Sequence, residues 1–198
     1  MSTRDYFLSI TEVGPIRDAV ASGNQALVEA VVSLRMKALR EEFGEDEDDP
    51  EFREYAESMI ACKSPPKAEP GCWNYVVEHL AKHLRLEPNA DLPFNEGWKH
   101  YYSWKPYRKL VKKHVTPQAM TSLRYLEDGR PLRGTSIDHD GCVFAWLSAD
   151  EVRELNDSLS RLDATVISDV GLIDFHETLV ESLQMISAES KSLFMGAH

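Results

Sequence analysis

The sequence predicts a mostly helical α+β fold, organised as a single domain with a small sheet of two or three short strands. Three observations predict it: helical spacing of apolar residues over most of the chain, short apolar runs near both ends, and a length of 198 residues. Chains of about 100–200 residues usually form one domain. No apolar run approaches the roughly 20 residues of a membrane helix. We therefore expect one cytoplasmic domain spanning 1–198, with no membrane association.

The N-terminal part begins with a short apolar run and continues with helices. Residues 6–10 (YFLSI) suit a strand, and a short helix is expected over 15–22. Asn24 can cap a second helix, whose apolar residues recur every three or four positions until Gly44 ends it. The Asp-Pro pair at 49–50 predicts a further helix, because aspartate caps the first turn and proline fixes φ at the first helical position.

Two connectors interrupt this pattern. Residues 41–51 form an acidic connector in which eight of eleven residues are Asp or Glu, and residues 63–70 form a loop with three prolines. Helical spacing returns over 72–86, and 87–97 is expected to be irregular. Two more X-Pro pairs, at 105–106 and 116–117, predict helix starts, the second helix ending at Asp128-Gly129.

The C-terminal third alternates strands and helices. Residues 134–141 are expected to form a loop, followed by a strand over 143–147. Ser148 and Glu151 have the spacing of a capping box and predict the start of a helix. The last helix carries apolar residues from 172 to 186, and 192–196 (SLFMG) suits a closing strand.

Charge and motifs exclude several classes of function. Lys and Arg total 22 and Asp and Glu total 33, which gives a net charge of −11. This charge disfavours binding to nucleic acid or anionic lipid unless a local basic patch provides it. Three cysteines with no CxxC pair argue against a secreted disulfide framework. No phosphate-binding loop, GxSxG elbow or GxGxxG fingerprint is present, so the large motif-bearing enzyme classes are not indicated.

The segment 98–114 (WKHYYSWKPYRKLVKKH) is the candidate binding site. It combines six Lys or Arg with five aromatic residues and contains no acid. Trp, Tyr and Arg are the usual anchors of protein interfaces, so we expect Trp98, Tyr101, Trp104 and Arg108 to anchor a partner protein. Interleaved cations and aromatics also suit single-stranded nucleic acid. A third interpretation places the aromatics in the core and the lysines on the solvent face of a helix.

His79 and His83 are weak metal candidates. Their spacing of four puts both imidazoles on one side of a helix, with Cys72 two turns earlier. Zinc needs three or four converging ligands, and the sequence supplies neither an HExxH motif nor a second pair. We expect no metal and no cofactor.

A non-local enzyme site is the alternative function. Asp138, His139 and Cys142 supply an acid, a base and a nucleophile on one loop, and this hypothesis adds His79 or His83 from elsewhere in the chain. The Asp140-Gly141 pair before an apolar run is more simply a turn that leads into a strand.

Three stretches carry a family resemblance: YFLSITEVGPIRDAVASGNQALVEAV near the start, CWNYVVEHLAKHL in the middle and FAWLSADEVRELNDSL in the last third. Together they resemble a family of uncharacterised bacterial proteins of similar length, known only as a domain of unknown function. The last third is more distantly similar to the small bacterial YfbM-like proteins. The matching positions are structural, such as Ser148, Glu151 and Trp73. The resemblance implies a bacterial origin and a compact fold, and it transfers no site residues.

The function expected from the sequence is therefore a non-enzymatic, acidic interaction module of the immunity or regulatory kind, with a protein partner docked near 98–114. The partner's identity and the oligomeric state are left open.

Overall fold

The computed structural model describes residues 5–44, 49–62, 67–68, 70–96, 102–133, 135–137 and 144–197. Along the chain these residues form the following elements: β1 (Asp5–Ile10), α1 (Gly14–Ala19), α2 (Gln25–Phe43), α3 (Pro50–Ala56), η1 (Glu57–Ala61), β2 (Lys67–Ala68), α4 (Pro70–His83), α5 (Pro93–Glu96), α6 (Trp104–Val111), α7 (Pro117–Asp128), β3 (Ser136–Ile137), β4 (Ala145–Leu147), α8 (Ala149–Leu159), η3 (Ala164–Val166), α9 (Val170–Ala188) and β5 (Ser192–Ala197). The predicted mostly helical α+β class is confirmed.

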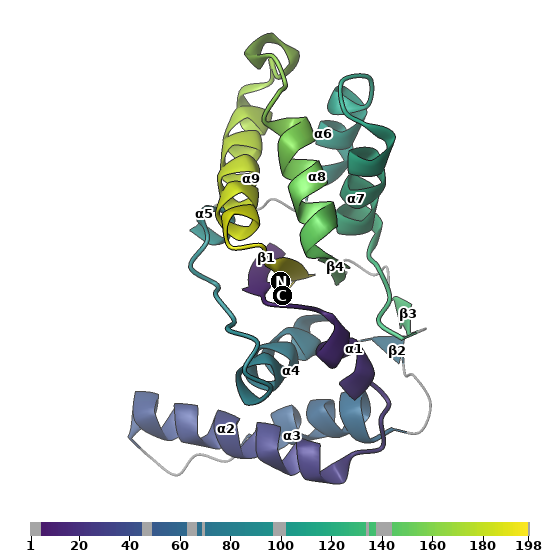
Figure 1. The fold of residues 1–198 in the computed structure, drawn as a ribbon. Coiled ribbons are helices and arrows are strands. Elements are labelled where there is room, and N and C mark those ends of the chain that lie inside the picture. The colour runs from purple at the N-terminus through teal and green to yellow at the C-terminus, as the bar shows by residue number, and fades with distance from the viewer. Residues whose placement is uncertain are drawn as a thin grey trace.

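A three-stranded antiparallel sheet joins the two ends of the chain. The strand order is β1-β5-β4, so the last strand lies in the centre and pairs with the first. Asp5 is opposite Ala197 in this register, which brings the chain ends side by side (Figure 1). All three apolar runs that predicted strands contribute to this sheet.

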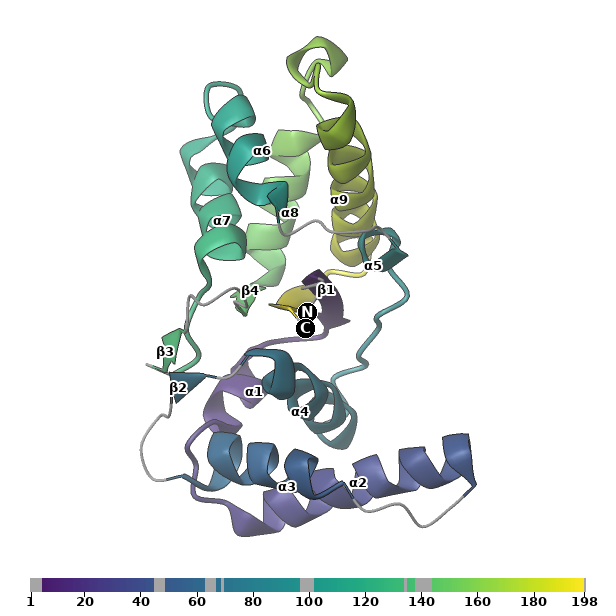
Figure 2. The same ribbon diagram turned by 180° about the vertical axis from the view of Figure 1, so that it is seen from behind.

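Helices cover both faces of the sheet. Helices α6 to α9 lie on one side and α1 to α4 on the other (Figure 1), and Figure 2 shows the same layers from behind with α6 beside α7. Alternate strand residues therefore enter two hydrophobic cores: Phe7 and Met195 face α6 to α9, whereas Leu8 and Phe194 face α1 to α4. Burial on both faces explains why β5 is apolar and buried at almost every position.

A side chain occupies the outer edge of β1. Asn95 accepts a hydrogen bond from the backbone N–H of Phe7 at 2.7 Å and donates one to the carbonyl of Phe7 at 2.8 Å. Its amide also donates to the carbonyl of Ala90 at 2.6 Å. The short helix α5, within the stretch 87–97 that was expected to be irregular, positions this asparagine. Asn95 thereby replaces a neighbouring strand for Phe7.

Four of the predicted helix starts are found with their caps, whereas the start predicted at 105–106 lies inside α6, which begins at Trp104 without a side-chain cap. Asn24, Asp49 and Thr116 each accept a hydrogen bond from the backbone N–H three residues on. Ser148 and Glu151 form the reciprocal capping box that their spacing predicted. Local sequence is sufficient for these features because each cap depends on residues within one turn.

The structure also contains pairing that was not expected. Residues 67–68, from the proline-rich loop, form a two-residue parallel ladder with 136–137, from the stretch expected to be a loop. The two segments are far apart in the sequence, and runs this short carry no strand pattern of their own.

In the described part of the chain, no helix has both the length and the apolar content needed to cross a membrane.

Candidate functional site

The structure describes part of the predicted binding segment 98–114. Residues 97–101 lie outside the described residues, so the structure does not test the expectations for Trp98 and Tyr101. Most of the remainder forms α6. This helix is strongly amphipathic, because its apolar residues recur at spacings of three and four while its cations occupy the other face.

Trp104 lies in the interior, which corrects the expectation that it is an exposed anchor. Its side chain is 3% exposed, and its ring packs edge-on against Phe175 with the ring centroids 4.9 Å apart. The indole N–H donates to Oδ2 of Asp5 at 2.7 Å. Helical spacing puts Trp104 on the same face as Tyr107 and Val111, and burial of that face takes the tryptophan inside. For this residue the core interpretation is the right one.

Arg108 lies at the surface, but it is engaged within the chain. Its guanidinium donates through Nε and a terminal nitrogen to both carboxylate oxygens of Glu127 on α7. The hydrogen bond to Glu127 raises the pKa of Arg108. The pair is only partly exposed and joins α6 to α7 in a fixed geometry. Arg108 therefore joins the two helices, and the edge of its guanidinium that binds Glu127 is not available to a partner.

A cationic pocket lies between α6 and α7. Its volume is about 240 Å³, and its lining consists of Arg108, Lys109, Lys112, Met120 and Arg124. In the described part of the chain, Lys109, Lys112 and Arg124 are exposed and form no ion pair. Met120 adds apolar surface to the ring of positive charge. Such a pocket suits an acidic group that carries an apolar portion.

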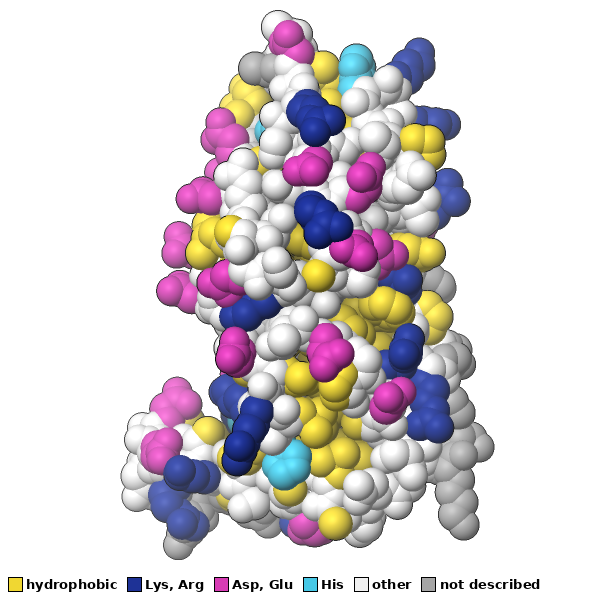
Figure 3. Space-filling view, viewed as in Figure 1, with side chains coloured by type: hydrophobic (Ala, Val, Ile, Leu, Met, Phe, Trp, Pro, Cys, Tyr) yellow, Lys and Arg dark blue, Asp and Glu magenta, His cyan; other side chains and the backbone are white. Residues whose placement is uncertain are grey.

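Further cations extend this surface along α6 and beyond its end. Lys105 and Lys113 are exposed, and neither forms an ion pair among the described residues. Figure 3 shows Lys and Arg side chains along the edge where α6 and α7 lie, and Asp and Glu side chains along the opposite edge, where α9 lies. The molecule is acidic as a whole; in this layer positive charge gathers at one edge and negative charge at the other, and the face between them carries both signs.

Asp5 marks a second site that the sequence analysis missed. It is the first residue of β1 and is 2% exposed. One carboxyl oxygen accepts the Trp104 hydrogen bond, and the other has no hydrogen-bond partner among the described residues. Burial raises the pKa of this carboxyl to about 6, although the Trp104 hydrogen bond acts to lower it. A carboxyl group with a strongly raised pKa is characteristic of functional sites.

Asp5 lines a cavity of about 320 Å³. The other residues that line the cavity belong to the start of α6 or just before it and to the end of α7: Tyr102, Trp104, Lys105, Pro106, Glu127 and Asp128. The alternation of side chains along β1 could have predicted the side of the sheet on which Asp5 lies. Asp5 alternates in phase with Phe7 and therefore faces the same side of the sheet, toward α6 to α9.

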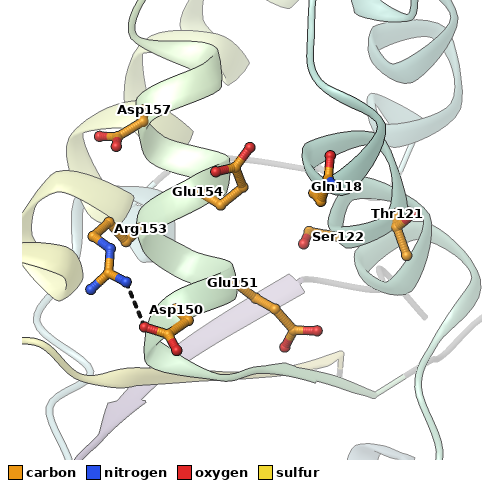
Figure 4. A pocket seen from close by; sticks show the side chains of 8 residues that line it. All are labelled: Gln118, Thr121, Ser122, Asp150, Glu151, Arg153, Glu154 and Asp157. Atoms are coloured by element: carbon orange, nitrogen blue, oxygen red, sulfur yellow. Dashed lines mark hydrogen bonds and ion pairs between the residues drawn. The ribbon is translucent and has the colours of Figure 1, made fainter.

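A wider groove of about 510 Å³ runs between α7 and α8, but three of its four acidic residues are already partnered (Figure 4). Asp150 pairs with Arg153, and Glu154 accepts a hydrogen bond from Thr116. Glu151 serves the capping box and pairs with Arg130 as well. Among the described residues, no group of three His, Cys, Asp or Glu is placed to hold a metal ion.

The two candidate metal ligands do not meet. His79 is 4% exposed, and its Nδ1 lies 2.8 Å from the carbonyl oxygen of Tyr75, whereas His83 is exposed to solvent. Burial lowers the pKa of His79, whose ring packs edge-on against Phe52. These contacts with described residues give His79 a structural role in the core. The proposed loop residues, from Asp138 to Cys142, lie outside the described residues.

Comparison with known proteins adds no functional assignment. No protein-family model matches this chain, and no curated protein or solved structure matches it at a significant level. The resemblance to a bacterial domain of unknown function therefore stays a prediction.

Proposed function

We propose that this chain is a non-enzymatic interaction module of the immunity or regulatory kind, which binds an acidic surface of a partner protein. The binding surface is the basic face of α6 and α7, defined as Lys105, Lys109, Lys112, Lys113 and Arg124. The observation that supports this most directly is a cluster of exposed cations around a partly apolar pocket, on a chain whose net charge is −11.

The arrangement suits recognition of a protein. Positive charge concentrated at one edge of an acidic molecule steers an acidic partner into one orientation, and the excess negative charge elsewhere disfavours the other orientations. The Arg108–Glu127 pair holds the two helices together, so the cations are displayed on a fixed frame and less conformational entropy is lost on binding. The pocket beside Met120 has room for one apolar side chain among the charges.

Single-stranded nucleic acid is the competing ligand for the same cations. Its binding would use exposed aromatic rings as stacking platforms, and the burial of Trp104 removes one of those expected from the sequence. The net charge of −11 also opposes attraction to a polyanion beyond the basic face. A protein partner with a limited acidic patch is favoured on both counts.

Site-specific crosslinking followed by affinity measurement tests the proposal. A photo-crosslinking residue in place of Lys113 should capture a protein, and isothermal titration calorimetry with that purified partner gives the dissociation constant. We expect the double variant Lys109→Glu/Lys112→Glu to weaken binding at least about tenfold, which corresponds to about 1.4 kcal/mol. The affinity should fall as salt is added, because the charges are exposed.

The matched control reverses two exposed cations on the other side of the sheet, Arg17 on α1 and Lys37 on α2. The variant Arg17→Glu/Lys37→Glu changes the net charge equally and should leave the dissociation constant within about twofold of wild type. Equal weakening by both double variants would show a net-charge effect and contradict the proposal. Tighter binding of a single-stranded oligonucleotide than of any crosslinked protein would replace it with the nucleic-acid function.

A further inference from the structure

The cavity beside Asp5 is separate from the pocket used in the proposed function. Glu127 lines this cavity, whereas its ion-pair partner Arg108 lines the cationic pocket, so the pair stands between the two. At about 320 Å³ the cavity lies at the small end of the range for ligand sites, about 300–1,000 Å³. Its occupant would therefore be a small molecule or a single side chain.

Asp5 places a buried, unpartnered acceptor beside this cavity. The carboxyl group is held at the first residue of β1, and the Trp104 indole fixes one of its oxygens at 2.7 Å. Its second oxygen is buried and lacks a hydrogen-bond donor among the described residues. Buried polar atoms nearly always have a partner, because leaving one unbonded costs free energy. The missing partner is a donor group.

The charges around the cavity indicate what kind of donor fits. Asp128 ends α7, where the partial negative charge of the helix C-terminus adds to that of its carboxylate. Glu127 is neutralised by Arg108, and Lys105 supplies one positive charge against Asp128. Among the described residues that line the cavity, this count leaves the charge of Asp5 without a counter-charge. The lining is therefore matched by a ligand with a single positive charge and N–H groups.

We propose that the cavity between β1, α6 and the end of α7 binds a primary ammonium group, with the unpartnered oxygen of Asp5 accepting a hydrogen bond from it. Asp128 contributes attraction at longer range, and Lys105 opposes binding by its like charge. The ammonium belongs either to a small free amine or to a lysine side chain, since the two present the same group.

Nuclear magnetic resonance offers a local reporter for this site. The indole N–H of Trp104 bonds to the same carboxyl group, so its ¹H–¹⁵N signal should shift when a ligand reaches the other oxygen. The probe is butylammonium at pH 7.5, and the variant Trp104→Phe identifies the signal. We expect a saturable shift with butylammonium. Butan-1-ol has no charge and tetramethylammonium has no N–H, so neither should reproduce it.

Variants separate the specific contact from general attraction to an acidic protein. Asp5→Asn should weaken butylammonium binding at least tenfold, Asp128→Asn should weaken it a few fold, and Lys105→Met should strengthen it. Asp157→Asn is the control: Asp157 is an exposed acid on α8, in the groove away from Asp5, and its replacement should leave binding unchanged. Asp128 and Lys105 are exposed, so those two variants test the site independently of any change at the buried Asp5.

Two results would overturn the proposal. The first is an equal shift with tetramethylammonium or butan-1-ol, and the second is binding that neither Asp5→Asn nor the Asp128 and Lys105 variants alter. Titration with lysine capped at both its amino and carboxyl groups then identifies the source. If the capped lysine binds more tightly than butylammonium, the site is assigned to a lysine side chain of a peptide. If it binds more weakly, the site is assigned to a free amine.

Discussion

Replacing Asp5 with asparagine should make the protein more stable at neutral and alkaline pH. Asn keeps an oxygen that accepts the Trp104 hydrogen bond, but it removes the charge from a side chain that is 2% exposed. The charged groups that face Asp5 across the cavity are Lys105 on α6 and Glu127 and Asp128 on α7. Their charges do not offset the burial, because burial is the largest cause of the raised pKa of Asp5.

The magnitude follows from the pKa of Asp5, which rises from 3.8 to about 6 on folding. A raised pKa means that the folded protein favours the protonated carboxyl. The resulting stability is fully present below pH 3.8 and is lost as the pH rises through about 6. The complete loss amounts to about 3 kcal/mol at roughly 1.4 kcal/mol per pKa unit. About 2 kcal/mol of it falls between pH 4.5 and pH 8.

Urea unfolding of wild type and Asp5→Asn at pH 4.5 and pH 8 measures this effect. Other titrating groups are common to both proteins, so they cancel in the difference between the two free energies of unfolding. The advantage of the variant should grow by about 2 kcal/mol from the lower to the higher pH. A difference that stays constant over this range would show that Asp5 titrates normally and would refute the reasoning.

Three further predictions concern the free energy of unfolding and use the same urea assay. Asn95→Ala removes the hydrogen bonds to both backbone groups of Phe7, and we expect a loss of about 2–4 kcal/mol; a loss below about 1 kcal/mol would mean that water replaces them. Gly196→Ala places a Cβ 1.5 Å from Oδ1 of the buried Asn74 and should lower the free energy of unfolding by about 2–3 kcal/mol. Adding Asn74→Ala to the same chain should restore part of this loss, and no restoration would contradict the clash. Ser148→Ala removes the cap of α8 and should cost about 1 kcal/mol, whereas an unchanged midpoint would show that the cap is not needed.

The site could be predicted from the sequence only in part. The amphipathic character of α6 was visible in its spacing, and so was the alternative that its aromatics face the core. Trp104 and Arg108 were nevertheless expected on a docking surface, and the structure buries the first and pairs the second with Glu127. Composition shows that cations and aromatic rings are close in sequence, but it does not show which helix face the core covers. That depends on the position of Phe175, about seventy residues away.

The sequence by itself determined most of the longer elements of this protein. Helix starts at Asn24, Asp49, Thr116 and Ser148 depend on hydrogen bonds within one turn, and the apolar runs near the two ends carry their own strand pattern. Such features involve neighbours in the chain, so a single sequence contains all that is needed to predict them.

Only the tertiary structure decided how these elements meet. The last strand inserts between the first strand and β4, so helices bury both faces of the sheet and Asp5 is carried into the interior. The same assembly brings Glu127 to Arg108 and places Arg124 beside Lys109 and Lys112. These contacts join residues from separate elements, and their geometry results from packing the two cores against a shared sheet.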